Sequence, residues 1–87
     1  VGLTLEAINK YKGALAKDPY SAEATMQLAA AYARTLRKGC AVALLRRLAD
    51  LQKNPKYEAD ATRMINAATQ DTSFALFRNE ADAAMGR

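Results

Sequence analysis

The sequence contains no histidine and no tryptophan, and it has a single cysteine, Cys40. These absences exclude Ser–His and Cys–His nucleophile pairs, zinc held by histidine, and any disulfide within one chain. The four glycines are isolated from one another, so they form no glycine-rich phosphate-binding loop. The nine acidic residues form no pair on a face that the helical patterns below would bury. We therefore expect no enzymatic activity, no cofactor and no metal.

The chain also has few residues that break helices or favour strands. It contains two prolines and little valine or isoleucine, whereas alanine is abundant and 51% of the residues are hydrophobic. Alanine has the highest helix propensity, so this composition favours an all-α fold. Eighty-seven residues make one small domain. No apolar run reaches the roughly 20 residues of a membrane span, and no signal peptide is visible, which leaves the localisation open.

Five segments carry apolar residues at helical spacing, and short turns separate them. The first, 3–17, stops before Pro19, because a residue that precedes proline is pushed out of the α region. Ser21 is expected to be the N-cap of the second segment. That segment is expected to end at Gly39, because glycine is common just past a helix end. The third segment stops before Pro55.

The last two segments are less regular. The fourth ends before three candidate N-caps for the fifth, namely Asp71, Thr72 and Ser73. A break in the fifth segment is expected near Arg78-Asn79, and Gly86 is expected to end the segment. Since all the connections are short, consecutive helices should be antiparallel.

Shifting the sequence by 34 residues superposes one part of the helical pattern on another. The two prolines, Pro19 and Pro55, are offset by 36 residues, so the second turn holds about two more residues. A period near 34 residues with helix–turn–helix content indicates a repeat. The pairs that match in apolar character are Ala7-Ile8 with Ala41-Val42, Tyr11 with Leu45, and Ala14 with Leu48.

Small residues, aromatics and a closing proline also recur in a fixed order. The residues concerned are Ala7, Tyr11, Ala14 and Pro19 in one stretch, and Leu28, Ala29 and Tyr32 in the next. In this order the chain resembles the tetratricopeptide repeat family. The resemblance implies antiparallel helix–turn–helix repeats that form a short right-handed α-solenoid of about five helices. It divides one domain, 1–87, into the second helix of a repeat (3–17), a complete repeat (21–53) and a divergent closing pair (56–86).

The chain departs from the family pattern at three positions. Leu48 stands where a small residue is usual, and Gly39 comes later in its turn than is common. Ala68 stands where an aromatic is expected, so the register of the fourth helix is ambiguous by about one residue. About three repeats are needed for a stable solenoid, so this chain lies at the lower limit or continues upstream. An exposed face of the first helix could also pair two copies.

The resemblance implies a protein-binding or scaffold function, because the first helix of each repeat lines a concave groove that receives a peptide or a partner helix. The residues that the fourth helix adds to this groove depend on its register, which is ambiguous by about one residue. The groove residues that follow are Glu23, Met26, Ala30, Ala33 and Arg34 from the second helix, and Thr62, Asn66, Thr69 and Gln70 from the fourth.

A basic stretch lies between Ala24 and Ala49, where no acidic residue occurs. With a net charge of +4, such a face favours an acidic protein partner. The alternative function is nucleic-acid binding through phosphate contacts, although no recognition helix or base-stacking motif accompanies the charge. A third interpretation is a solvated face with cations that suit helix ends. The basic residues at the surface are expected to be Arg37, Lys38, Arg46 and Arg47, in addition to Arg34.

Cys40 follows the turn at Gly39 and precedes an apolar run. We expect it to be a small buried residue at a helix start. The alternative is a thiolate activated by the helix N-terminus and a neighbouring arginine.

Overall fold

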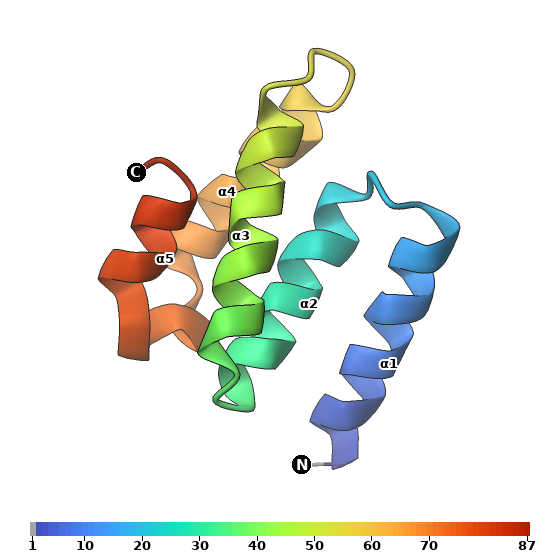
Figure 1. Ribbon diagram of the computed structural model, residues 1–87, viewed down its shortest axis with the longest axis vertical. Coiled ribbons are helices and arrows are strands. Elements are labelled where there is room, and N and C mark those ends of the chain that lie inside the picture. The colour runs from blue at the N-terminus through green and yellow to red at the C-terminus, as the bar shows by residue number, and fades with distance from the viewer. Residues whose placement is uncertain (1) are drawn as a thin grey trace.

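The protein is described by a computed structural model that covers residues 2–87 (Figure 1). Over these residues it consists of helices and turns and contains no strand, which confirms the predicted all-α class. The helices are α1 (Gly2–Lys17), α2 (Ala22–Arg34), α3 (Lys38–Gln52), α4 (Glu58–Gln70), the 3₁₀ helix η1 (Thr72–Phe77) and α5 (Arg78–Ala84). None of them is long and apolar enough to cross a membrane.

Helix α2 occupies the centre of the molecule (Figure 1). It packs against α1, α3, α4 and η1, whereas α5 packs against α3. Three consecutive residues of α2, Ala29, Ala30 and Ala31, are fully buried. Because an alanine side chain is one methyl group, neighbouring helices can approach α2 closely from several sides. The larger side chains of the core come from those neighbours, among them Leu45 and Phe74.

The turns after α1 and after α3 are built in the same way. In the first, the Tyr20 amide donates to Asp18 Oδ1 (3.1 Å), and in the second the Lys56 amide donates to Asn54 Oδ1 (2.9 Å). Short polar side chains at these positions replace backbone partners just where a proline ends each helix. The rings of Tyr20 and Tyr57 then stack, with centroids 5.1 Å apart, and so join the two turns to each other.

The predicted start of α2 is confirmed, but its predicted end is wrong. Ser21 caps the helix, since the Ala24 amide donates to Ser21 Oγ (3.1 Å). The helix ends at Arg34, and Gly39 lies in the first turn of α3 rather than past the end of α2. The reversal is made earlier, by Leu36, whose φ of 60° is in the left-handed region.

Leu36 occupies the position that glycine usually takes in a Schellman motif. Its amide donates to the Ala33 carbonyl (3.1 Å), and the Arg37 amide donates to the Tyr32 carbonyl (2.9 Å). The Arg37 guanidinium lies 5.9 Å from the Tyr32 ring centroid, where this motif commonly has an apolar contact. A left-handed conformation costs a non-glycine residue about 1–2 kcal/mol, so the turn is formed at the expense of stability.

The closing segment, residues 71–86, begins, breaks and ends where the sequence predicts. Asp71 caps η1 by accepting the Ser73 amide (2.8 Å), and the break near Arg78 is the junction between η1 and α5. Gly86, with a φ of 77°, follows the end of α5. The expected fifth helix is therefore a 3₁₀ helix followed by a short α-helix.

Leu45 provides a direct test of this core, because its side chain is fully buried in α3. Leu45→Asp would place a carboxylate among apolar side chains with no partner. We expect this variant to lose its cooperative thermal unfolding transition, followed by circular dichroism. A melting curve like that of the parent protein would contradict the position of Leu45 in the core.

Candidate partner-binding surfaces

The centre of the groove predicted from the sequence is closed in the structure. The expected groove residues Met26, Ala30 and Ala33 are 5%, 0% and 4% exposed, and they belong to the same apolar cluster as Phe74. The physical reason is that α4 and η1 both pack against α2 and contribute side chains to the same apolar cluster. These three residues are therefore part of the core and offer no surface to a partner.

The other predicted groove residues are at the surface but do not form one site. Glu23 and Arg34 are exposed at opposite ends of α2, and Arg34 Nη1 donates to Ser73 Oγ (3.0 Å). Asn66 and Gln70 are exposed on α4, on the side of that helix opposite its buried residues. Thr62 and Thr69 of the same helix are half-buried and already hydrogen-bonded, to Gln52 Nε2 (2.9 Å) and to the Asn66 carbonyl (2.7 Å) respectively.

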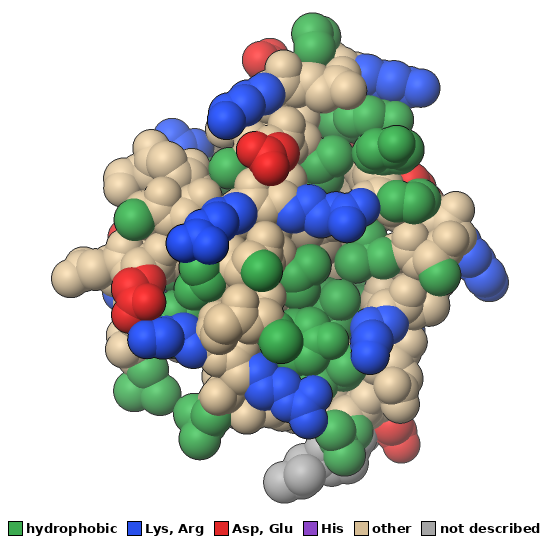
Figure 2. Space-filling model, in the orientation of Figure 1, with side chains coloured by type: hydrophobic (Ala, Val, Ile, Leu, Met, Phe, Trp, Pro, Cys, Tyr) green, Lys and Arg blue, Asp and Glu red, His purple; other side chains and the backbone are tan. Residues whose placement is uncertain are grey.

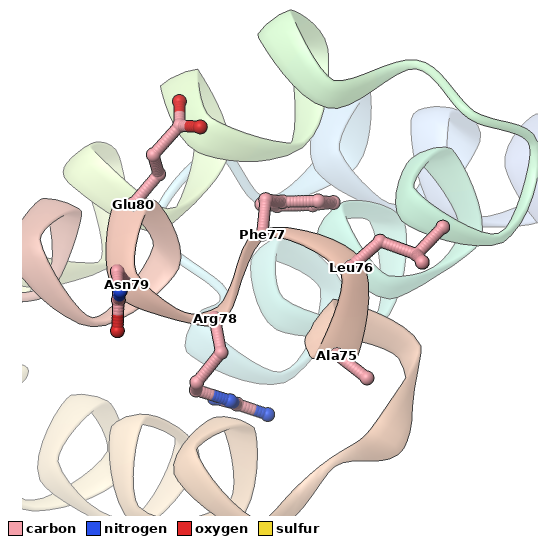
Figure 3. A pocket seen from close by; sticks show the side chains of 6 residues that line it. All are labelled: Ala75, Leu76, Phe77, Arg78, Asn79 and Glu80. Atoms are coloured by element: carbon pink, nitrogen blue, oxygen red, sulfur yellow. The ribbon is translucent and has the colours of Figure 1, made fainter.

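Arg78 fastens the segment that closes this groove. It is turned away from Phe77 and Glu80 (Figure 3). Its Nη1 atom donates to the Ala68 carbonyl (3.1 Å) and pairs with Asp82 Oδ1 (3.2 Å), and its Nη2 atom donates to the carbonyl oxygen of the η1 cap. One guanidinium group thus joins the end of α4, the start of η1 and α5.

A second apolar surface remains open between α1 and α3. The buried residues Ile8, Leu28 and Ala31 form a small cluster there, separate from the main core. Figure 2 shows hydrophobic side chains gathered between α3 and α1 on this face. We call the half-buried side chains packed on this cluster the tyrosine patch: Ala7, Tyr11 and Leu15 of α1, Tyr32 of α2 and Leu44 of α3.

Basic side chains border the tyrosine patch. Arg37 lies over the Tyr32 ring as described above, and Lys10 Nζ is 5.6 Å from the Tyr11 ring centroid. Arg47 Nη2 donates to the Pro19 carbonyl (2.8 Å). The Arg47 side chain therefore extends from α3 to the turn after α1. Lys and Arg side chains surround the apolar area in Figure 2 as well.

The four residues expected to form one basic face are exposed but are divided between two sides of α3. Arg37 and Arg47 face the tyrosine patch. Lys38 Nζ pairs instead with Glu80 Oε1 (3.0 Å), and Arg46 lines a pocket with Met85 at the end of α5. The structure therefore places two of the four predicted cations beside the tyrosine patch, and Lys10, over the Tyr11 ring, also lines a pocket with the exposed Glu23.

Over residues 2–87, no group of three or more His, Cys, Asp or Glu side chains is arranged to hold a metal ion. Cys40 is exposed in the first turn of α3, so its expected burial is wrong.

Comparison of the chain with protein-family models finds no match, and comparisons with curated proteins and with solved structures find none either.

The tyrosine patch was not identified by the sequence analysis, although one signal for it was present. Tyr11 and Tyr32 belong to the recurring pattern of small residues and aromatics in the predicted helices. A stripe on α1 can be covered only by the helices that α1 meets, and in the structure it packs mainly against α2. A terminal helix with one main neighbour leaves part of its apolar stripe uncovered.

The role of Arg78 can be tested by its removal. Arg78→Ala leaves the carbonyl groups at the end of α4 without this donor, and we expect a loss of about 1–3 kcal/mol in the free energy of unfolding. The matched control is Arg63→Ala, which removes an exposed arginine that pairs with Asp60 one turn away and should change the stability by less than about 0.5 kcal/mol. Urea unfolding measures both. Equal effects of the two substitutions would show that Arg78 does not fasten the closing segment.

Proposed function

We propose that this chain is a non-catalytic protein-interaction module that binds an acidic amphipathic helix of a partner protein through the tyrosine patch. The observation that carries the proposal is the patch itself, an incompletely covered apolar surface bordered by Lys10, Arg37 and Arg47. Its surroundings suit a partner of opposite charge, since the chain has a net charge of +4.

The composition of the patch fits helix recognition. Tyrosine and arginine are the residues most enriched among those that dominate binding energies, because they combine a large contact area with directed polar groups. An amphipathic helix presents apolar residues at i, i+3, i+4 and i+7, and these could cover Tyr11, Tyr32 and Leu44 together. Acidic residues on its flanks would then meet Arg37 and Arg47.

The tetratricopeptide resemblance and the solenoid arrangement stay predictions, and the proposed site differs from the one they imply. The family pattern assigns binding to α2 and α4, whereas the patch belongs mainly to α1, with one residue each from α2 and α3. The function proposed here, recognition of a peptide or helix, is the one that the resemblance implies. The surface that performs it is argued from the exposed side chains of this chain.

A titration with designed peptides tests the proposal. The probe is a 16-residue helix with leucines at i, i+3, i+4 and i+7 and glutamates elsewhere, followed by ¹⁵N chemical shifts of the protein. We expect binding with a dissociation constant of about 10–100 μM and shifts concentrated in α1 and α3. A peptide of the same design with lysine in place of glutamate should bind at least about 10-fold more weakly.

A pair of matched double variants separates local contacts from overall charge. Arg37→Glu/Arg47→Glu should weaken binding of the acidic peptide by about 10-fold or more. Lys53→Glu/Arg63→Glu changes the net charge equally at exposed positions outside the patch and should have a much smaller effect. Shifts on α4 and the Glu23 end of α2, with none at Tyr11, Tyr32 or Leu44, would contradict the proposed site. Tighter binding of a single-stranded oligonucleotide than of the peptide would favour the nucleic-acid function.

A further inference from the structure

The turn between α2 and α3 contains a leucine in a conformation that glycine would adopt more easily. The same pair of hydrogen bonds ends α5, where the Gly86 amide donates to the Ala83 carbonyl (3.0 Å) and the Arg87 amide to the Asp82 carbonyl (2.8 Å). There the residue in the left-handed conformation is Gly86, with a φ of 77°, and glycine adopts this conformation without strain. In α2 the equivalent residue is Leu36.

Contacts of the Leu36 side chain within the chain do not offset the strain of its left-handed backbone. It is 78% exposed, so the strained backbone brings almost no burial of apolar area. Strained residues persist where the surrounding structure imposes them, and they are concentrated at functional sites. An exposed leucine held in this way therefore points to contact with another molecule.

A second exposed leucine lies next to the first. Leu76 of η1 is 83% exposed, and Figure 3 shows it leaving η1 beside Phe77. Leu36, Leu76 and Phe77 line a pocket of about 210 Å³ together with Ala33, Lys38 and Glu80. Ala33 is buried beneath the pocket, and we call the other five residues the leucine face. It is distinct from the tyrosine patch and shares no residue with it.

The leucine face carries one charge of each sign. Lys38 and Glu80 form an ion pair of 3.0 Å at its edge, and both side chains are more than half exposed. The charges of the residues that form the face therefore cancel, while Arg34 and Arg37 lie beside it. A neutral face with an adjacent cation and anion is complementary to itself, because a two-fold axis sets each cation opposite the anion of the other copy.

We propose that two copies of this chain associate through their leucine faces about a two-fold axis. Leu36 and Leu76 of each copy cover the pocket of the other, and Lys38 lies opposite the partner's Glu80. The face is small, so the total buried area falls below the roughly 1,200 Å² of a standard interface, and the dimer is weak. We expect a dissociation constant of about 0.1–1 mM.

Sedimentation velocity from about 10 μM to about 2 mM tests association over the range that the expected dissociation constant sets. The weight-average mass should rise with concentration for the parent protein. Leu36→Gly and Leu76→Ser should each abolish the rise, whereas Leu5→Ser, which removes an exposed leucine of α1, should leave it unchanged. A parent protein that stays monomeric throughout, or a Leu5→Ser variant that loses association equally, would overturn the proposal.

Leu36→Gly has a second readout that a merely structural residue would not give. At about 10 μM, where the chains are monomeric, its Tm should exceed that of the parent by a few degrees. Relief of the left-handed strain then outweighs the chain entropy that glycine adds to the unfolded state. Higher stability combined with lost association is the expected result. A lower Tm would show that Leu36 stabilises its own chain and would remove the reason for assigning it to an interface.

Charge reversal tests the two-fold arrangement. Lys38→Glu alone and Glu80→Lys alone each set like charges opposite one another, so each variant should remain monomeric. An equimolar mixture of the two restores opposite charges at both contacts, and its mass should rise again. A mixture that stays monomeric while the parent protein associates would contradict the two-fold pairing.

Discussion

The close packing around the alanines of α2 is the contact on which the rest of the structure depends. Three consecutive residues there, Ala29, Ala30 and Ala31, are fully buried, and four other elements reach the helix from different sides. Larger side chains at these three positions would hold the neighbouring elements apart, so α2 can be central only because these side chains are small. The neighbours contribute the bulk of the core in return, with Leu45 from α3, Ile65 from α4 and Phe74 from η1.

This central position decides which surfaces are left for other molecules. Since α4 and η1 pack against α2 and Ala30 is fully buried, a groove on that face is not accessible. The apolar side chains that remain uncovered lie where an element has fewer neighbours, as on α1 beside Tyr11, or where the chain reverses, as at Leu36. We propose an acidic partner for the first surface, which is bordered by cations, and a second copy of the chain for the second.

The sequence predicts the helices well and the tertiary contacts poorly, for a physical reason. Caps and stops such as Ser21, Asp71 and Pro55 act on their own segments, so local patterns identify them. The path of η1 depends on contacts between distant residues, such as Arg78 with the end of α4, and no periodicity encodes them. The end of α2 was misplaced because glycine, the usual residue for that turn, occurs at Gly39 while Leu36 makes the reversal.

Accessibility of the α2 methyl groups to a soluble paramagnetic probe tests most directly whether this face of α2 is closed. The measurement uses the unmodified chain with ¹³C-labelled alanine and methionine methyl groups. We predict weak relaxation enhancement at Met26 and Ala30, which are buried, and strong enhancement at Ala43, which is exposed on α3. Enhancement at Ala30 equal to that at Ala43 would contradict the account, because the face of α2 would then be open to solvent and available to a partner.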